Sequence, residues 1–464
     1  MNDEIQAQLR QIPSVDQMMA QLKAGLVGPT IRIKIVRQAI ELVRRQVLES
    51  KLSHGADVAG MILAQVQWQL TELTEVYYKR VVNAAGIILH TGLGRAPLAR
   101  EVIDQITQEM GGYSLLQVDV EAGKRSSRDG RIEELLTLLT GAQAATVVNN
   151  NAAATALVLN TIAAGKEVIV SRGQLVEIGG SFRLPDVMAF SSAKLVEVGT
   201  TNKTHLADYE KAITENTAAI LRVHPSNYKI HGFTSEVPLK DLVELAHAKG
   251  LLVFDDMGAG SLIDFSRFGF DKEPTLNESV QTGADVITSS GDKLLGASQA
   301  GIILGSAAII QKIRKNQFAR IVRVDKFTLA ALEATLKLFL DETAVFEKIP
   351  TLRLIQRIPE DIQQQAERIA ACIKTACPNA MVSISPGHSQ IGSGSLPGQN
   401  LPTTRVAIAS PKISTAEIGN KLRHYATPVF TRIGDDRVLI DPRTLLDGDE
   451  AILVRALIET LTGE

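Results

Sequence analysis

Hydrophobic and polar positions change their pattern twice along the chain, and the three patterns predict three structural regions. The first, up to about residue 78, has apolar residues at helical spacing and no strand-like alternation. One helix is predicted to begin near Pro29, with its apolar side formed by Val36, Ile40, Val43 and Val47. A second is predicted from about Asp57 to Lys79. We therefore expect a small helical domain over residues 1–78.

The second region, from about residue 81 to 305, alternates short apolar runs with helical stretches, which is typical of a mostly parallel sheet covered by helices. Its predicted strands are Ala145–Val148, Glu167–Val170, Leu195–Val198, Ala218–Val223, Leu251–Phe254, Val286–Ser289 and Gly301–Leu304. Two more helices are expected near residues 306–317 and 326–341. We assign residues 79–340 to this large α/β domain.

The third region, residues 341–464, is predicted to be a smaller α+β domain. Its strands are expected at Met381–Ser385, Arg405–Ile408, Val429–Arg432 and Val438–Asp441. The segment Ser385–Pro402 is rich in glycine, serine and proline, which predicts a long loop with either a function of its own or only a flexible position at the surface.

Composition narrows the class of protein. Of the 464 residues, 45% are hydrophobic and 22% are charged, which is ordinary for a globular chain, and no run of 18 apolar residues occurs. The start of the chain, Met1–Glu4, is acidic where a signal peptide is basic, so a cytoplasmic protein with no membrane contact is expected. Cys372 and Cys377 match neither a disulfide framework nor a zinc or redox pair, so we expect buried free thiols and no metal site.

Charge is distributed unevenly along the chain. The net charge of −2 argues against a general nucleic-acid-binding protein. Between Lys23 and Lys51, however, basic residues outnumber the acidic Glu41 and Glu49. The basic residues of this window are Lys23, Arg32, Lys34, Arg37, Arg44, Arg45 and Lys51. The window is therefore either a solvated helix face or a surface that binds phosphate.

Polar residues follow four of the predicted strands at their carboxyl ends. The four groups are Asn149–Asn151, His224–Asn227, Asp255–Asp256 and Ser290–Lys293. Because open α/β sheets bind ligands at that edge, we expect one site assembled from four loops.

Lys293 indicates what chemistry this site performs. Burial at the sheet edge lowers the pKa of a lysine amine and leaves it free for Schiff-base chemistry, which is how pyridoxal 5′-phosphate is used by enzymes. That cofactor also needs an acid at its ring nitrogen. Asp256 is predicted for this role, with its neighbour Asp255 as the less favoured choice.

The same cofactor needs a cradle for its phosphate. Asn150, Asn151 and Ala152 are predicted to open a helix directly after a strand, so that their backbone N–H groups and the helix dipole receive an anion. Ser290 adds a hydroxyl, and Asn227 is a further cofactor-binding candidate. On these residues alone, the alternative is a nucleotide or sugar-phosphate site.

Several longer strings resemble the family of bacterial selenocysteine synthases, the L-seryl-tRNA(Sec) selenium transferases. The resemblance runs from the N-terminal region to the end of the chain. The strings are LHTGLGRA (residues 89–96), VVNNNAAA (147–154), VSRGQLVEIGG (170–180), SGDKLLG (290–296), DKFTLAALEATL (325–336) and SQIGSGSLP (389–397).

This resemblance implies a fold-type-I pyridoxal-phosphate enzyme in which Lys293 is the Schiff-base lysine. It implies dehydration of the seryl group on its tRNA to an aminoacrylyl intermediate, followed by transfer of selenium from selenophosphate. Arg95, Arg320 and Arg323 match family arginines that line the selenium-donor site, and Asp292 matches the acid beside the lysine. The guanidinium group of arginine is permanently charged and can donate two parallel hydrogen bonds, which suits the binding of a small oxyanion such as selenophosphate. The resemblance also implies tRNA binding by the N-terminal domain and a ring-like homodecamer built from dimers.

Some features depart from the family pattern or leave alternatives open. Gly92 stands where many members have asparagine, and Ala297–Ser298 replace a Gly-Pro pair, which concerns the turn after Lys293 and the selectivity for the donor. Arg432 and Arg443 are interpreted as structural, because an ester-linked seryl group has no free carboxylate to bind. The alternative functions are a pyridoxal-phosphate lyase acting on a small amino acid or amino sugar acid, and a tRNA-binding protein that has lost catalysis.

Overall fold

The computed structural model describes residues 3–23, 25–53, 55–180 and 182–463, so that Met1 and Asn2 of the acidic start lie outside it. The chain forms two compact units, Met1–Arg80 and Val81–Glu464. The boundary between them falls close to residue 78, where the sequence predicts the end of the helical domain. In the described residues, no helix is long and apolar enough to cross a membrane.

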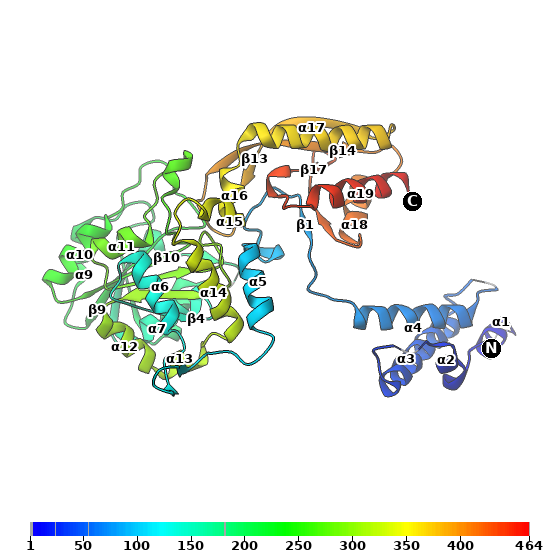
Figure 1. Cartoon of the computed structure of the whole chain (residues 1–464), viewed down its shortest axis with the longest axis horizontal. Helices are drawn as coiled ribbons and strands as arrows, with labels where there is room; N and C mark the ends of the chain where they lie inside the picture. The colour runs from blue at the N-terminus through cyan, green and yellow to red at the C-terminus, as the bar shows by residue number, and fades with distance from the viewer. Residues whose placement is uncertain (1–2, 24, 54, 181, 464) are drawn as a thin grey trace. The chain divides into compact units, whose positions relative to one another are not determined.

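The first unit consists of helices packed through their apolar sides (Figure 1). They are α1 (Asp3–Arg10), α2 (Val15–Gln21), α3 (Pro29–Leu48) and α4 (Val58–Thr74). Pro29 occupies the first turn of α3, as predicted. The helix α4 ends at Thr74, earlier than predicted, because the backbone turns to an extended conformation at Glu75. Val36, Val43 and Ile62 are buried between the helices, which leaves the basic side chains of α3 on the outside.

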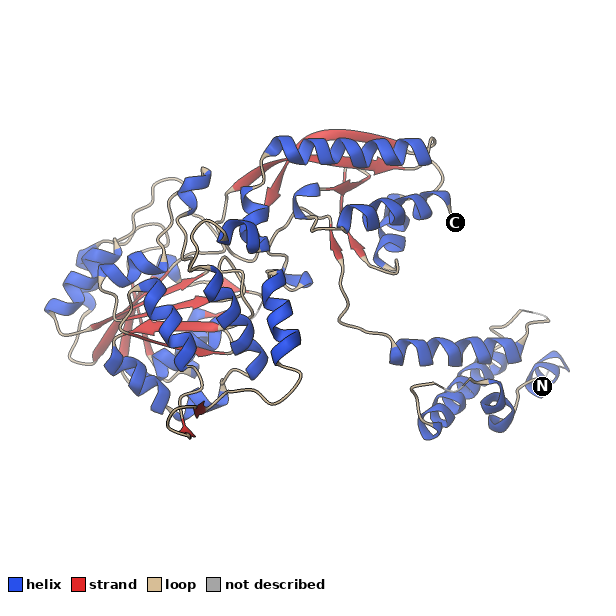
Figure 2. Cartoon of the chain, in the orientation of Figure 1, coloured by secondary structure: helices blue, strands red, loops and turns tan. Residues whose placement is uncertain are grey.

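The second unit is built around a seven-stranded sheet (Figure 2). Its strands, in spatial order, are β4 (Ala144–Val148), β12 (Gly301–Gly305), β11 (Val286–Ser290), β10 (Leu252–Gly258), β9 (Thr217–Val223), β5 (Glu167–Ser171) and β8 (Lys194–Val198). All the predicted strands of this region are confirmed. Strand β12 is the one strand of this sheet with reversed direction, so it pairs antiparallel with both β11 and β4. Residues 291–300, between β11 and β12, are too few for the crossover that a parallel pair requires.

Helices cover both faces of this sheet and bury alternate residues of its strands. On one face, α6 (Gly130–Thr140) and α14 (Lys326–Leu338) pack against Val147 and Ile302. On the other face, α7 (Asn151–Ala163), α8 (Leu184–Phe190) and α12 (Ala307–Lys315) pack against Val148 and Ile303. The remaining helices of this part are α5 (Arg100–Glu109), α9 (Leu206–Ala212), α10 (Leu239–Ala248), α11 (Leu276–Thr282) and α13 (Gln317–Ile321). The two buried faces make the sheet a rigid support for the loops at its carboxyl edge.

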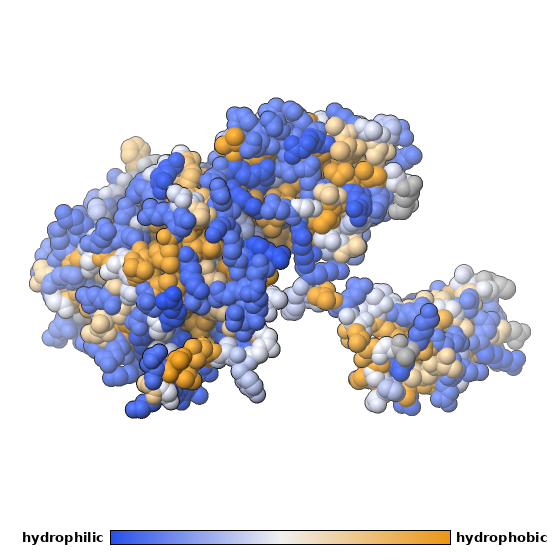
Figure 3. Space-filling view, in the orientation of Figure 1, coloured by the Kyte–Doolittle hydropathy of each residue, from blue (hydrophilic) through white to orange (hydrophobic). Residues whose placement is uncertain are grey.

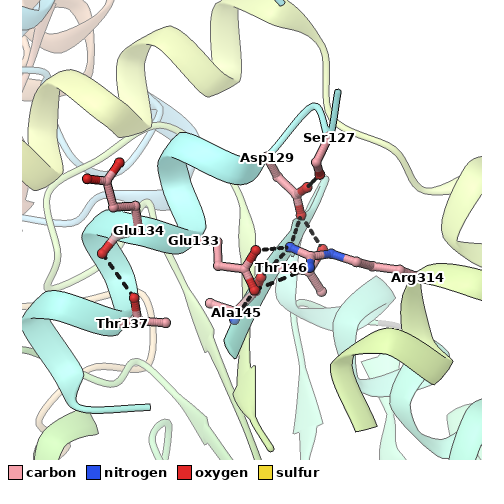
Figure 4. A network of polar contacts seen from close by, with 8 residues as sticks. All are labelled: Ser127, Asp129, Glu133, Glu134, Thr137, Ala145, Thr146 and Arg314. Atoms are coloured by element: carbon pink, nitrogen blue, oxygen red, sulfur yellow. Dashed lines mark hydrogen bonds and ion pairs between the residues drawn. The ribbon is translucent and has the colours of Figure 1, made fainter. Parts of the chain in front are cut away.

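A polar network anchors α6 and α12 to the first strand of the sheet (Figure 4). Arg314 on α12 donates through Nη2 to Glu133 (2.8 Å), to Asp129 (3.2 Å) and to the Ala145 carbonyl (2.8 Å). Burial raises the pKa of Asp129, but hydrogen bonds from Ser127 and Thr146 and the charge of Arg314 outweigh it and hold the pKa low. Strand β4 is thereby fixed just before the turn that leads into α7.

The C-terminal part of this unit has a separate four-stranded antiparallel sheet. Its strands, in spatial order, are β13 (Met381–Gln390), β14 (Asn400–Ala409), β17 (Arg437–Ile440) and β16 (Arg432–Gly434). Its helices are α17 (Pro359–Ala376), α18 (Thr415–Arg423) and α19 (Asp449–Thr462), and α15 (Val345–Lys348) and α16 (Pro350–Gln356) lead into it. Short strand pairs are β1 (Val82–Asn83) with β15 (Val429–Phe430), β2 (Val118–Asp119) with β3 (Lys124–Arg125), and β6 (Glu177–Ile178) with β7 (Phe182–Arg183).

Three predictions about this part of the chain are wrong. Half of the segment Ser385–Pro402 is strand, because β13 and β14 pair along their full length and only residues 391–399 remain as a loop. Pro386 is tolerated there because β13 is an edge strand. The predicted strand Val429–Arg432 is divided between β15 and β16, which belong to different sheets. Finally, Cys377 is buried but Cys372 is exposed on α17.

Candidate functional site

A pocket of about 230 Å³ lies at the carboxyl edge of the large sheet, where the predicted strand-end loops meet. Eight residues singled out in the sequence line it: Arg95, Asn150, Asn151, Ala152, Asp256, Ser290, Asp292 and Lys293. Four of them lie on α7, β10 and β11, three lie in the turns that follow β4 and β11, and Arg95 comes from a loop before α5. The site is therefore assembled from segments far apart in the sequence, as the pattern of strand ends predicts.

Lys293 follows β11 after a short turn and is only 5% exposed. The turn is closed by a hydrogen bond from the Gly296 N–H to the Lys293 carbonyl (3.0 Å) and by another from the Ala297 N–H to the Gly291 carbonyl (2.9 Å). The pKa of the Lys293 amine is lowered, mainly by burial and then by the positive charge of Arg95. The negative charges of Asp292 and Asp256 raise it, but by less. The amine is therefore neutral, and nucleophilic, over a wider pH range than that of a free lysine.

The two neighbouring aspartates have different surroundings. Both lie inside β10 rather than after it, which corrects the predicted end of that strand. Asp255 is paired with Arg222 (2.9 Å) and accepts a hydrogen bond from Ser279 (2.6 Å), so its charge is already balanced outside the pocket. Asp256 lines the pocket, and no basic side chain in the described residues is ion-paired with it.

Asp256 is buried and held by neutral donors. Its oxygens accept hydrogen bonds from Asn151 Nδ2 (2.9 Å), Thr155 (3.0 Å), Thr288 (3.0 Å) and the Gly258 N–H (3.2 Å). Burial raises the pKa of this carboxyl, and these hydrogen bonds oppose that effect. A buried carboxylate with a fixed orientation and no cation of its own suits a ligand that brings a positive N–H group to it.

The N-terminus of α7 faces the same pocket. Asn150 caps this helix, and its side-chain oxygen accepts a hydrogen bond from the Ala153 N–H (2.9 Å). The first N–H groups of a helix have no partner within it, and together with the dipole they favour an anion. Ser290, at the end of β11, lines the pocket as well. The side chain of Asn151, in contrast, is directed at Asp256 through its amide nitrogen.

Arg95 and Asp292 form an ion pair at the edge of the pocket. Arg95 Nη1 donates to Asp292 Oδ2 (2.7 Å), and Arg95 Nε donates to Ser393 Oγ (2.9 Å). Ser393 belongs to the loop between β13 and β14, so this contact links the pocket to the C-terminal part of the unit.

Three predicted site residues lie elsewhere. The Asn227 side chain is exposed and donates to the Glu177 carbonyl (2.8 Å), so its amide does not line the pocket. Arg320 and Arg323 line a different cavity, together with Arg128. Within one chain, the three arginines predicted to act together are therefore divided between two cavities.

Two further pocket residues, His224 and Ser226, belong to the predicted strand-end group His224–Asn227, but the sequence predicts no role for either of them. His224 lines the pocket, and burial together with the charge of Arg222 lowers its pKa to about 4. The neighbouring Ser226 is 2% exposed, and its hydroxyl has no hydrogen-bond partner among the described residues. Their position after a strand was visible in the sequence, but which of the residues 224–227 face the pocket is set by the turn. Arg432 and Arg443 donate to backbone carbonyls, which agrees with their interpretation as structural residues.

These residues fit pyridoxal 5′-phosphate. The buried Lys293 amine, with its lowered pKa, suits the aldehyde of that cofactor, the Asp256 carboxylate suits its ring nitrogen, and the N-terminus of α7 suits its phosphate. For comparison, no group of three His, Cys, Asp or Glu side chains in the described part of the chain is arranged to hold a metal ion.

Comparison with known proteins agrees with this geometry. Residues 81–446 match the family model described as L-seryl-tRNA selenium transferase. The chain is 44% identical over 457 residues to the L-seryl-tRNA(Sec) selenium transferase of Alkaliphilus oremlandii, which covers 97% of this chain and 98% of the relative. It is 45% identical over 454 residues to the enzyme of that name from Clostridium perfringens, with coverage of 97% and 98%.

A solved structure shares the fold. D-glucosaminate-6-phosphate ammonia-lyase superposes with a TM-score of 0.57 at 20% identity, over 85% of this chain and 98% of that chain. The predicted fold-type-I architecture, with a large α/β part and a smaller C-terminal α+β part, is confirmed. At 20% identity this similarity shows a shared fold only. The family is shown by the sequence matches over nearly the whole chain. The chain belongs to the L-seryl-tRNA selenium transferase family.

Proposed function

We propose that this protein converts L-seryl-tRNA(Sec) to L-selenocysteinyl-tRNA(Sec), with pyridoxal 5′-phosphate as cofactor and selenophosphate as selenium donor. The observation that carries the proposal is the buried Lys293 amine, which shares one pocket with the Asp256 carboxylate and the N-terminus of α7 in a chain of this family. We expect the enzyme to act in the cytoplasm, where aminoacyl-tRNAs are made.

Asp256, Ser290, Lys293 and the N-terminus of α7 have assigned roles in this reaction. Pyridoxal phosphate, when bound, withdraws electrons from the α-carbon of an attached amino acid, so that a hydroxyl on the β-carbon can leave. With the cofactor in the pocket, Asp256 would hold the proton on its ring nitrogen, and the N-terminus of α7 and Ser290 would bind its phosphate. The Lys293 amine accepts the proton from the seryl α-carbon and returns it to the departing hydroxyl, which leaves as water.

Arginine side chains are the groups to which we assign binding of the selenium donor. Arg95 lies at the rim of the pocket, where its Nη1 is paired with Asp292. A guanidinium group is planar, always charged and able to donate two parallel hydrogen bonds, so it is suited to bind an oxyanion. Arg320 and Arg323 line another cavity of the same chain, so their action at a Lys293 pocket requires a second copy. Exposed apolar side chains such as Tyr113, Leu115 and Ile321, and the apolar patches visible in Figure 3, support a homo-oligomer. A homodecamer built from dimers is the assembly we propose.

The first unit supplies a surface for the tRNA. Lys34, Arg37, Arg44 and Arg45 are exposed on α3. Arg37 and Arg44 are separated by about two helical turns and therefore share one side of α3, and Arg45 lies beside Arg44 around the helix. A row of this kind can contact successive phosphates of a nucleic-acid backbone.

The proposed function is tested by single-turnover conversion of seryl-tRNA(Sec) in the presence of selenophosphate. Bulk seryl-tRNA and free serine serve as controls. We expect selenocysteinyl-tRNA to form from seryl-tRNA(Sec) alone. Conversion of free serine at a comparable rate would instead indicate a lyase that acts on a small amino acid.

Asp256→Asn is expected to retain the cofactor but to slow elimination of the seryl hydroxyl on the order of 100-fold, as for removal of one preorganised electrostatic interaction. An amide cannot balance the positive charge on the ring nitrogen. Bound cofactor is measured by absorbance and elimination by the decrease in recoverable serine from the tRNA. Ser279→Ala, which removes a hydrogen bond of Asp255 only, is the matched control, and a wild-type rate in Asp256→Asn would contradict the assignment.

Arg95→Ala, Arg320→Ala and Arg323→Ala are each expected to impair selenium transfer more than dehydration. Removal of one charge-assisted hydrogen bond to an oxyanion costs about 1.5 to 3 kcal/mol, or roughly 10- to 150-fold in affinity. The two steps are followed separately, as the decrease in recoverable serine and as incorporation of labelled selenium. Arg368→Ala, at an exposed pair with Glu450, is the control. Equal impairment of both steps would mean that these arginines hold the fold or the tRNA.

A further inference from the structure

The loop of residues 391–399 contacts the pocket residue Arg95 through Ser393. Its first residues pair with the segment that leads to Arg95: the Ile88 N–H donates to the Gln390 carbonyl (3.0 Å) and the Leu89 N–H to the Ile391 carbonyl (2.7 Å). This pairing joins segments about three hundred residues apart and fixes the register between them. As a result, Ser393 lies within hydrogen-bond distance of Thr91 and Arg95.

Close packing holds the loop on two sides. Gly392 has a φ of +85°, and an added Cβ there would lie 2.5 Å from Ile87 Cγ2. Gly394 has a φ of +65°, and an added Cβ would lie 2.9 Å from Asn227 Cβ. Neither position has room for a side chain, and both have a backbone conformation that favours glycine. Ser393 is therefore held between two fixed points.

Ser393 and Arg95, which contact each other, both have an uncommon backbone conformation. Ser393 has a φ of 51° and Arg95 a φ of 63°, both in the left-handed region, where residues other than glycine are found mainly when their surroundings require it. Ser393 Oγ accepts from Arg95 Nε (2.9 Å) and lies 3.0 Å from Thr91 Oγ1. Arg95 Nη1 donates to Asp292 (2.7 Å), whereas Nη2 forms no hydrogen bond with any described residue and is left for a ligand.

We propose that Ser393 is a positioning residue for selenium transfer, which holds the Arg95 guanidinium at the pocket edge in the orientation that receives the oxyanion donor. With the Asp292 contact alone, the guanidinium can pivot about a single hydrogen bond. The second contact, at Nε, fixes its plane, which is what bidentate binding of an oxyanion requires. This inference rests on the proposed function, and in particular on the donor role of Arg95.

Two substitutions in the full-length holoenzyme separate the hydroxyl of Ser393 from its backbone conformation. Ser393→Gly keeps the left-handed backbone and removes the acceptor, whereas Ser393→Asn tolerates that backbone and offers a side-chain oxygen instead. We expect Ser393→Gly to raise the KM for selenophosphate about 3- to 10-fold with kcat and the dehydration step near wild type. We expect Ser393→Asn to restore most of the affinity. Thermal unfolding verifies that both variants are folded.

A double variant shows whether Ser393 acts through Arg95. Ser393→Gly combined with Arg95→Ala should be no worse than Arg95→Ala alone. Three results would overturn the positioning role of Ser393. The first is a double variant that is impaired by the full sum of the two single effects, and the second is a wild-type KM in Ser393→Gly when the KM of Arg95→Ala is raised. The third is equal impairment of dehydration and selenium transfer. A wild-type KM in Arg95→Ala would overturn the donor role of Arg95, and the Ser393 proposal with it, so the two failures are distinguishable.

Discussion

Lys293→Ala is expected to abolish covalent attachment of pyridoxal phosphate and to slow conversion of seryl-tRNA(Sec) by at least about 10³-fold, because the amine that attaches the cofactor and carries the proton is removed. No other lysine among the described residues lines the pocket, and this amine is buried with a lowered pKa. Borohydride reduction of the loaded enzyme should fix the cofactor to Lys293, as identified by mass spectrometry of its peptides. Lys240→Ala, at an exposed position on α10, should behave as wild type.

The pH dependence of cofactor capture gives an independent measure of the same amine. Only the deprotonated amine attacks the cofactor aldehyde, so the rate of capture by the apoenzyme rises as the pH passes the pKa of Lys293 in the folded protein. Because burial and the charge of Arg95 lower that pKa, the midpoint should lie below that of a free lysine. Arg95→Ala should move it upward. An adduct on another lysine, or a midpoint at the ordinary value, would contradict the assignment.

Charge reversal of Arg37, Arg44 and Arg45 to glutamate is expected to weaken binding of tRNA(Sec) at least about 100-fold at low salt, because three attractive interactions with phosphates become repulsive. Cofactor binding should be unchanged, since all the pocket residues lie in the second unit. The salt dependence should also become less steep, by a log-log slope of about 0.7 to 0.9 for each phosphate that is no longer neutralised. Gel-shift titration at several salt concentrations measures both quantities.

Deletion of residues 1–80 should have the same effect on tRNA binding, because it removes the whole first unit at its boundary. Arg10→Glu, at the exposed end of α1, controls for a change of charge elsewhere in the unit. An elongator tRNA(Ser) tests discrimination. Should the truncated protein retain full affinity and discrimination, the first unit is only structural and the tRNA is recognised by the second.

Local sequence patterns were sufficient to predict the elements of the large sheet. The inner strands β5, β9, β10, β11 and β12 of this sheet, and β4 at one edge, are short apolar runs that are largely buried, and such a run is recognisable within a few residues. The pattern was misleading where polar residues lie inside strands. Asp255 and Asp256 continue β10 because both carboxylates find donors there, and β13 extends through Pro386 as an edge strand. Neither condition is visible from neighbours in the sequence.

The linear order of strands and loops determines which residues lie at the carboxyl edge of the sheet. It places Asn150, Asp256 and Lys293 there, independently of the contacts that their side chains make. How the side chains divide between the pocket and its surroundings depends on three-dimensional packing. Successive residues of a strand face opposite sides, so Asp255 pairs with Arg222 while Asp256 faces the pocket. Turn geometry directs Asn227 away from the pocket, and pairing across about three hundred residues brings Ser393 to Arg95. Such long-range contacts depend on packing and register, which no local pattern encodes.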